Sequence, residues 1–460
     1  MDDASGISLS HTAFRSYDEA VEWINGLIPF GIRPGLARME VLMEKLDHPH
    51  RRLKFIHVAG TNGKGSVCAY LSSVLTKCGY AVGTFTSPYI QKFTNRIQLN
   101  GRDIEEEQLL SIANQLRPLV DEIAAGELGP PTMFEVTTAL AVVYFARHAY
   151  PDFVVWETGL GGRLDCTNIV IPIVSIITNI GHDHMDILGD SLEKIALEKA
   201  GIIKSGVPVI SAVEQQEALR VIEREAREKH STLYLLGREF DYKAVSVREN
   251  EQIFHFTSPF RSLRAAEISL NGPHQLKNAS TALMALDVLK QYYAVILDDG
   301  DLLPALKQTK WPGRLEMVQS QPRILLDGAH NPEGAESLAD SLQKVYRYRK
   351  LHMMFGMLST KNHSGYIRHI LPMVNTLIVT EPDFRKKISA RELHRTVEEL
   401  LPEFSKHPVE IIVEPDWRAA LARLIDLTAE EDLAVVTGTL YLIADVRAWI
   451  LNQSDCEKGW

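Results

Sequence analysis

The chain has 460 residues, of which 45% are hydrophobic and 23% charged, and its formal net charge is −10. This balance is typical of a globular protein of two or three domains, and the acidic charge argues against a general nucleic-acid binder. The four cysteines are scattered without a CxxC pair, so we expect neither a disulfide framework nor a cysteine zinc site. This cysteine usage is typical of a protein in a reducing compartment.

The sequence shows no targeting or membrane-spanning segment. Met1-Asp2-Asp3 opens the chain without the basic and apolar regions of a secretory signal. The longest apolar runs, such as residues 169–177, are too short to cross a bilayer. We therefore expect a cytoplasmic monomer that has neither a membrane nor a nucleic-acid partner and binds small molecules.

Short β-rich runs alternate with helical patterns along most of the chain. The first half has predicted strands at 55–59, 81–86, 153–156, 173–178 and 207–210, with helices at 66–77 and 136–146. Between 234 and 270, the alternation at 242–247 and 253–256 predicts a β-hairpin. Later strands are predicted at 323–326, 351–355, 376–380, 410–413 and 433–436. This order predicts βαβ units and mostly parallel sheets, with ligands at the carboxyl ends of the strands.

A glycine-rich run, Gly60-Thr61-Asn62-Gly63-Lys64-Gly65-Ser66, lies between a predicted strand and a helix. Backbone N–H groups and a helix N-terminus in this context bind phosphate, and Lys64 would neutralise the β- and γ-phosphates. Ser66 could reach the phosphates or a metal. The run departs from the usual P-loop, because its first interval is shorter and Gly65 separates the lysine from the hydroxyl.

Three later motifs carry residues suited to a magnesium site. They contain Ser87 before a proline, Glu157 at a strand end, and His184 in a His-Asp-His trio. A hydroxyl, a carboxylate and one imidazole would make a sparse, open site of the kind that Mg²⁺ accepts. The His-Asp-His spacing also suits zinc, but no further His or Cys ligand is obvious nearby.

The run from His57 to Ser66 resembles the nucleotide loop of the folylpolyglutamate synthase and bifunctional dihydrofolate synthase family, within the Mur ligase superfamily. Mur ligases proper usually carry threonine where this chain has Gly65. The resemblance extends from about Tyr17 to Leu440. It implies an α/β protein with an N-terminal P-loop-containing Mur-ligase-like ATPase domain over 1–315. A smaller C-terminal Rossmann-like domain over 316–460 would bind glutamate.

The resemblance also implies roles for residues on the phosphate side. Ser87, Glu157 and His184 match the Mg²⁺ ligands of the family. Lys199 matches a catalytic lysine that carbon dioxide converts to a carbamate, whereas the residues alone suggest an exposed helical lysine.

The nucleotide and amino-acid contacts follow in the same way. Asn278 matches an adenine contact, with a helix cap as the alternative. Arg314, in the hinge motif that begins at Trp311, matches a phosphate contact, and Asp327 a ribose-side contact. His330 is a catalytic candidate near the glutamate or the acyl phosphate.

Five residues match segments that line the pterin pocket in bacterial bifunctional relatives: Phe134, Glu135, Leu164, Asp165 and Cys166. Those relatives often have alanine where this chain has Cys166, which is a small change. Phe134, taken without the family, is an aromatic residue of the core.

The implied function is an ATP- and Mg²⁺-dependent ligase that joins L-glutamate to a folate carboxylate through an acyl phosphate. The sequence leaves open whether it extends folylpolyglutamate, makes dihydrofolate from dihydropteroate, or does both. A Mur-type ligase for cell-wall precursors is an alternative, although Gly65 and the early position of the loop argue against it. A P-loop ATPase switch and an inactive nucleotide-binding scaffold are further alternatives.

Overall fold

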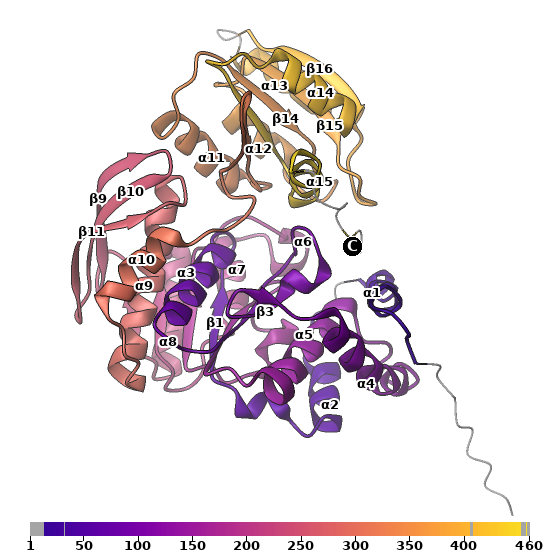
Figure 1. Ribbon diagram of the computed structural model, residues 1–460, viewed down its shortest axis with the longest axis vertical. Helices are drawn as coiled ribbons and strands as arrows, with labels where there is room; N and C mark the ends of the chain where they lie inside the picture. The colour runs from indigo at the N-terminus through magenta and orange to yellow at the C-terminus, as the bar shows by residue number, and fades with distance from the viewer. Residues whose placement is uncertain (1–12, 32, 405–407, 452–456, 458–460) are drawn as a thin grey trace, which may run out of the picture.

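The computed structural model describes residues 13–31, 33–404, 408–451 and 457, so the observations on Met1 to Asp3 and on Cys456 lie outside the described residues. Two α/β bodies follow one another along the chain, and a small antiparallel sheet lies beside the first (Figure 1). The expected mixed α/β fold is confirmed. No helix among the described residues is long and apolar enough to cross a membrane.

The larger sheet has eight strands in the order β4-β3-β2-β5-β1-β6-β7-β8. All neighbours pair in parallel except the edge, where β2 pairs with β3 and β3 with β4 in antiparallel fashion. The strands are β1 (Phe55–Ala59), β2 (Val82–Phe85), β3 (Ile97–Leu99), β4 (Arg102–Asp103), β5 (Phe153–Glu157), β6 (Val174–Ile177), β7 (Val209–Ser211) and β8 (Leu233–Leu235).

Helices cover both faces of this sheet, which is why its central strands β1 and β5 are buried along their whole length and mostly apolar. Ile56 and Val58 pack with helices α3, α9 and α10, whereas Phe55 packs with α4 and α5 on the opposite face. The helices are α1 (Tyr17–Asn25), α2 (Ala37–Lys45), α3 (Lys64–Lys77), α4 (Glu106–Ala124), α5 (Met133–Tyr144), α6 (Met185–Leu188), α7 (Leu192–Ala200), α8 (Gln216–Glu228), α9 (Pro273–Tyr293) and α10 (Asp299–Gln308).

The small sheet has three strands, β9 (Asp241–Arg248), β10 (Glu251–Thr257) and β11 (Ser262–Ile268), where the sequence predicted only a two-stranded hairpin. The third strand escaped the pattern because it is irregular. Ala265 has a φ of 56°, and the pairing of β10 with β11 shifts its register between Phe254 and Phe256. Such a bulge interrupts the alternation by which a strand is recognised.

The C-terminal body is a six-stranded sheet in the order β12-β13-β17-β14-β15-β16, parallel except for the pair β12–β13. Its strands are β12 (Glu316–Ser320), β13 (Arg323–Leu326), β14 (Leu351–Phe355), β15 (Thr376–Glu381), β16 (Glu410–Asp416) and β17 (Leu433–Thr437). Helices α11 (Pro332–Lys344), α12 (His363–Ile370) and α13 (Ala390–Leu400) pack on one face, and α14 (Trp417–Leu427) and α15 (Leu440–Ile450) on the other.

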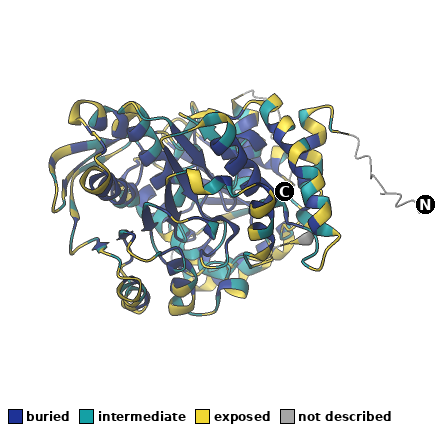
Figure 2. Cartoon of the chain, turned by 90° about the horizontal axis from the view of Figure 1, so that it is seen from below, coloured by how far each residue is buried: buried dark blue, intermediate teal, exposed yellow. Residues whose placement is uncertain are grey.

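Buried residues concentrate in the strands and on the inner helix faces, and exposed residues lie along the outer helix faces (Figure 2). Each fully buried Val, Leu or Ile side chain contributes roughly 1.5–3 kcal/mol to the free energy of folding, so the packing of helices on the two sheets stabilises both bodies. The carboxyl ends of β1, β5 and β6 carry loops toward the C-terminal body. The candidate site lies there.

Candidate active site

A cavity of about 520 Å³ lies between the two α/β bodies. It is lined by the glycine-rich loop, by the ends of β5 and β6, by the start of α9 and by the loops around β13. The predicted residues that it brings together are Gly60, Thr61, Asn62, Gly63, Lys64, Gly65, Ser66, Ser87, Glu157, His184, Lys199, Asn278, Arg314, Asp327 and His330. These residues span most of the chain.

The glycine-rich loop packs tightly on the loop that follows β6. The backbone N–H groups of Thr61 and Asn62 donate to Asn179, and the Thr178 hydroxyl donates to the Asn62 carbonyl at 2.6 Å. The Thr61 hydroxyl is 2.9 Å from the backbone nitrogen of Gly181. This support fixes the loop in the shape that the N-terminus of α3 requires to receive an anion.

Two glycines of the loop are needed because neighbouring side chains approach closely. Gly63 has a φ of 83°, and a Cβ there would lie 2.5 Å from the Asn278 side chain. A Cβ on Gly65 would lie 2.6 Å from the Trp311 ring. The glycine that distinguishes this loop from the common pattern therefore lets the hinge tryptophan pack directly against it.

The side chains of Lys64 and Ser66 are held by hydrogen bonds within the protein. The Lys64 ammonium donates to the carbonyls of Gly60 and Thr61, at 3.1 and 3.4 Å. The buried Ser66 hydroxyl accepts a hydrogen bond of 3.2 Å from the Gln275 side chain on α9. An ammonium group has three N–H donors and Lys64 lines the cavity, so it is able to donate to an anion bound there.

Glu157 is a buried carboxylate at the end of β5, only 3% exposed. Among the described residues, the single donor to it is the backbone N–H of Ser87, at 2.9 Å. Burial raises the pKa of Glu157, and the charges of Lys64 and Arg314 oppose that rise. A carboxylate held this way, with capacity to accept more, suits a cation.

Lys199 is buried, which overturns the expectation of an exposed helical lysine from the residues alone. Its side chain is 4% exposed at the end of α7, and its amine donates to the Gly60 carbonyl at 2.9 Å. Burial, together with the nearby charge of Lys64, lowers the pKa of Lys199 to about 7. Near neutral pH a large fraction of this amine is therefore uncharged and nucleophilic.

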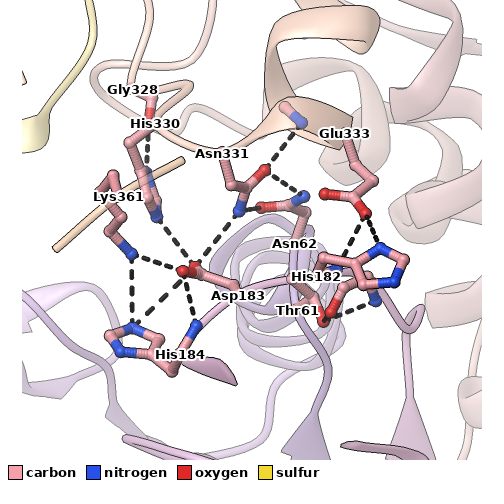
Figure 3. A network of polar contacts seen from close by, with 12 residues as sticks. Thr61, Asn62, His182, Asp183, His184, Gly328, His330, Asn331, Glu333 and Lys361 are labelled. Carbon is pink, nitrogen blue, oxygen red and sulfur yellow. Dashed lines mark hydrogen bonds and ion pairs between the residues drawn. The ribbon is translucent and has the colours of Figure 1, made fainter. Parts of the chain in front are cut away.

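Asp183 is the residue that sequence reasoning missed, although it lies between two histidines that were noticed. It contacts Lys361 at 2.6 Å, His330 at 3.4 Å and Asn331 at 3.3 Å, all from the C-terminal body (Figure 3). Burial acts to raise the pKa of Asp183, but His330 and Lys361 outweigh it and hold that pKa far below its ordinary value. The missing signal is tertiary, because Lys361 lies far along the chain.

The neighbours of Asp183 in the same loop also face the C-terminal body. His182 pairs with Glu333 at 3.0 Å through its ring. His184 lines the cavity, and burial with the charge of Lys361 lowers its pKa to about 4. The His184 ring is therefore neutral at pH 7, which is the form that binds a metal.

Asn62 and Asn331 form a second link between the bodies. Each side-chain amide donates to the other at 3.1 Å (Figure 3). Asn331 also caps α11 by accepting from the backbone of Gly334. The glycine-rich loop is thus joined directly to the first helix of the C-terminal body.

Arg314, Asp327 and Asn278 complete the cavity wall. Asp327 is buried and accepts from the backbone N–H groups of Leu315 and Ala329, at 3.1 and 2.9 Å. Burial raises the pKa of Asp327, and Arg314 opposes the rise. Asn278 is the sixth residue of α9, which begins at Pro273, so the alternative of a helix cap is wrong.

A second cavity of about 320 Å³ lies next to the first. Pro88, His184, His330 and Leu440 line both cavities. Among the described residues, its lining includes no carboxylate but has basic side chains at Lys361, Arg385 and Lys386. The second cavity is therefore suited to an anion.

The five predicted pterin residues do not line either cavity. Glu135 is 3% exposed and accepts from Arg38 at 3.0 Å and from the backbone of Thr132, in the box that caps α5. Phe134 stacks on Phe85 with ring centroids 5.9 Å apart.

Leu164, Asp165 and Cys166 likewise have partners within the protein. Asp165 accepts from the backbone of Leu160 at 2.7 Å and from Thr167. The Cys166 thiol lies 3.2 Å from the Thr138 hydroxyl, and burial raises the pKa of both Asp165 and Cys166. The Leu164 carbonyl accepts from Gly35 at 3.1 Å.

Comparison with known proteins finds family models that match both α/β bodies. The model of the Mur ligase middle domain matches residues 58–286, and that of the Mur ligase glutamate ligase domain matches residues 313–440. A Bacillus subtilis dihydrofolate synthase/folylpolyglutamate synthase is 39% identical over 94% of this chain and 99% of its own length.

Solved structures resemble the whole chain. A Mycobacterium tuberculosis folylpolyglutamate synthase complexed with ADP and AMPPCP has a TM-score of 0.86 at 27% identity, covering 96% of this chain and 100% of its own. An Escherichia coli FolC in complex with DHPP and ADP has a TM-score of 0.84 at 28% identity, covering 96% of this chain and 99% of its own. The chain belongs to the dihydrofolate synthase/folylpolyglutamate synthase family of Mur ligases.

Proposed function

We propose that this protein is an ATP-dependent ligase that joins L-glutamate to the carboxylate of a folate. The observation that carries the proposal is the cavity of about 520 Å³ between the two bodies. There a phosphate loop, a buried carboxylate and a buried lysine of lowered pKa meet Arg314 and His330. The relatives act as dihydrofolate and folylpolyglutamate synthases by name, which supports a folate as the acceptor.

The nucleotide occupies the larger cavity. The N-terminus of α3 and Lys64 hold the phosphates, Asn278 contacts the adenine, and Asp327 the ribose side. Arg314, a guanidinium from the hinge, approaches the phosphates from the opposite wall. The ADP complexes of related structures support a nucleotide at this site.

Ser87, Glu157 and His184 would hold Mg²⁺. Among the described residues no group of three or more His, Cys, Asp or Glu side chains converges on one point, so a closed metal cage is not formed. An open magnesium site needs only one or two carboxylates, because substrate phosphates and water supply the remaining oxygens. The buried Glu157 and the neutral His184 fit this donor set, and the ion would neutralise phosphate charge.

Lys199 is proposed to carry a carbamate. Its neutral amine attacks the carbon of carbon dioxide, a nitrogen–carbon bond forms, and the amine loses a proton to solvent. Burial and the pKa of about 7 support this step. The product is an anion close to Lys64 and to the Gly60 carbonyl.

The reaction proceeds in two displacements. A folate carboxylate oxygen attacks the γ-phosphorus, and ADP leaves. The glutamate amine then attacks the acyl carbon, and phosphate leaves. The protein positions the reactants, neutralises charge through Lys64 and Arg314, and excludes water by closing the two bodies on each other.

We assign the second cavity to the incoming glutamate. Lys361, Arg385 and Lys386 provide positive charge for its carboxylates, and His330 lines the passage to the acyl phosphate. We propose that the C-terminal glutamate-binding domain begins near Glu316, where β12 starts, and that the protein acts as a monomer.

The residues predicted for the pterin pocket have a structural role in this proposal. Because Glu135, Asp165 and Cys166 are satisfied within the protein, we propose that they shape the wall of the pterin pocket. Phe134 offers the aromatic surface on that wall.

One assay tests the function. The purified enzyme is incubated with ATP, Mg²⁺ and labelled glutamate, and receives dihydropteroate or tetrahydrofolate in turn. Label is expected in the folate product, and the acceptor that works decides which of the two activities the enzyme has. Incorporation with neither acceptor would sink the assignment and favour a P-loop ATPase switch.

A further inference from the structure

The wall between the two cavities contains an ion pair that crosses from one body to the other. Asp183 lines only the nucleotide cavity, and Lys361 lines only the second one. Their charged atoms are 2.6 Å apart, and the side chains are only 11% and 8% exposed. A pair that is this short and this shielded holds its partners in one geometry.

Asp183 also contacts two further polar side chains of the C-terminal body. His330 lies 3.4 Å away and Asn331 3.3 Å away (Figure 3). The Asp183 loop is itself tied to the phosphate loop, through the Thr61 hydroxyl and the backbone of Gly181. A chain of direct contacts therefore runs from the phosphate loop through Asp183 to Lys361.

We propose that Asp183 is a positioning residue, which holds Lys361 at the glutamate cavity and ties the C-terminal body to the phosphate loop. The proposal rests on the proposed function, because it takes the second cavity as the glutamate site. It adds that glutamate binding depends on the Asp183 carboxylate, which belongs to the N-terminal body. Contact between the two bodies and glutamate binding are therefore coupled.

The test compares Asp183→Asn with a matched interdomain variant. Glu249→Gln removes the Arg323–Glu249 pair, which also joins the bodies at 3.1 Å but lies away from both cavities. Asp183→Asn is expected to raise the KM for glutamate about tenfold and leave the KM for ATP within about twofold. Glu249→Gln should leave both constants unchanged.

Three further arms separate positioning from a general structural role. Lys361→Gln should raise the glutamate KM similarly, and the double variant with Asp183→Asn should be no worse than the poorer single one. Asp183→Glu, which keeps the charge, should recover part of the loss. The Mg²⁺ concentration for half-maximal ADP formation should not change in Asp183→Asn.

Other outcomes overturn the proposal. They are a loss in kcat with both KM values unchanged, an additive double variant, a shifted Mg²⁺ requirement, or a lower glutamate KM that would mark Asp183 as a competitor of the substrate. If Asp183→Asn does not fold, Asp183→Glu decides: it should raise the KM for glutamate by less than Lys361→Gln does, and an unchanged KM for glutamate contradicts the proposal.

Small-angle scattering gives a readout that does not depend on activity. The ligand-free Asp183→Asn protein should have a larger radius of gyration than the wild type, and Glu249→Gln should not. An unchanged radius contradicts the proposal even if the wild type fails to incorporate glutamate, which would refute the proposed function separately.

Discussion

The polar side chains proposed to bind the phosphates face a cavity, whereas those proposed for the pterin wall hydrogen-bond to other groups of the protein. Glu157, Lys199 and Arg314 line the nucleotide cavity, and Glu157 has a single donor among the described residues. Glu135 and Asp165 are equally buried, yet each has several donors. Burial alone therefore does not mark a catalytic carboxylate. Unused hydrogen-bonding capacity facing a cavity does.

Substitutions on the two sides should differ in whether they reduce turnover or stability. Substitutions on the phosphate side should reduce turnover and leave stability nearly intact. Substitutions on the pterin side should reduce stability first, because they leave buried partners unsatisfied.

Lys64→Ala should lower kcat by about 10³ or more, because it removes a preorganised positive charge from the transferring phosphoryl group. ADP release measures this effect. Lys77→Ala, an exposed lysine at the end of the same helix, is the control and should be neutral. Near-normal turnover in Lys64→Ala would remove the loop from the mechanism.

Lys199→Ala should lower turnover by about 10², with an unfolding midpoint close to that of the wild type, since a buried amine is costly in any case. The control is Lys194→Ala on the same helix, whose side chain is 63% exposed. Turnover near normal in Lys199→Ala would eliminate the proposed carbamate.

Gly65→Ala should raise the KM for ATP about tenfold, because the new methyl group would displace the Trp311 ring from the loop. Adding Trp311→Leu should relieve the clash and restore part of the affinity. If the single variant binds ATP normally, the contact between loop and hinge has no bearing on nucleotide binding.

Glu135→Gln should destabilise the protein by about 3–5 kcal/mol in urea unfolding, because it leaves Arg38 as a buried charge without its partner. Glu122→Gln, which breaks an exposed pair with Lys45, should cost no more than about 1 kcal/mol. Unchanged stability combined with a much higher KM for dihydropteroate would make Glu135 a direct substrate ligand.

Cys166→Ala should have the smallest effect, a loss of about 1 kcal/mol in stability. Among the described side chains its thiol is hydrogen-bonded only to Thr138, so the KM for dihydropteroate should stay within about twofold. A larger shift in that KM would show that the thiol reaches the pterin.

Local pattern was enough for the fold and for the place of the glycine-rich loop between β1 and α3. The strand 55–59 is predicted with the bounds that the structure has, because four of its five residues are apolar and such a run is visible in the local pattern. Lys199 could not be recognised as buried from its helix alone, since its burial depends on the Gly60 loop. Asp183 and Lys361 could not be paired, because nothing local links residues so far apart. Strand β11 was missed for its bulge at Ala265.

If the cavity activates a carboxylate by phosphorylation, as proposed, an oxygen atom moves from the carboxylate to the released phosphate. The acceptor is prepared with heavy oxygen in the carboxylate that receives glutamate, and the phosphate released during turnover is analysed by mass. One heavy oxygen is expected in each phosphate, because the carboxylate oxygen leaves with the phosphoryl group. Phosphate without label, released while glutamate is incorporated, would contradict the acyl-phosphate route.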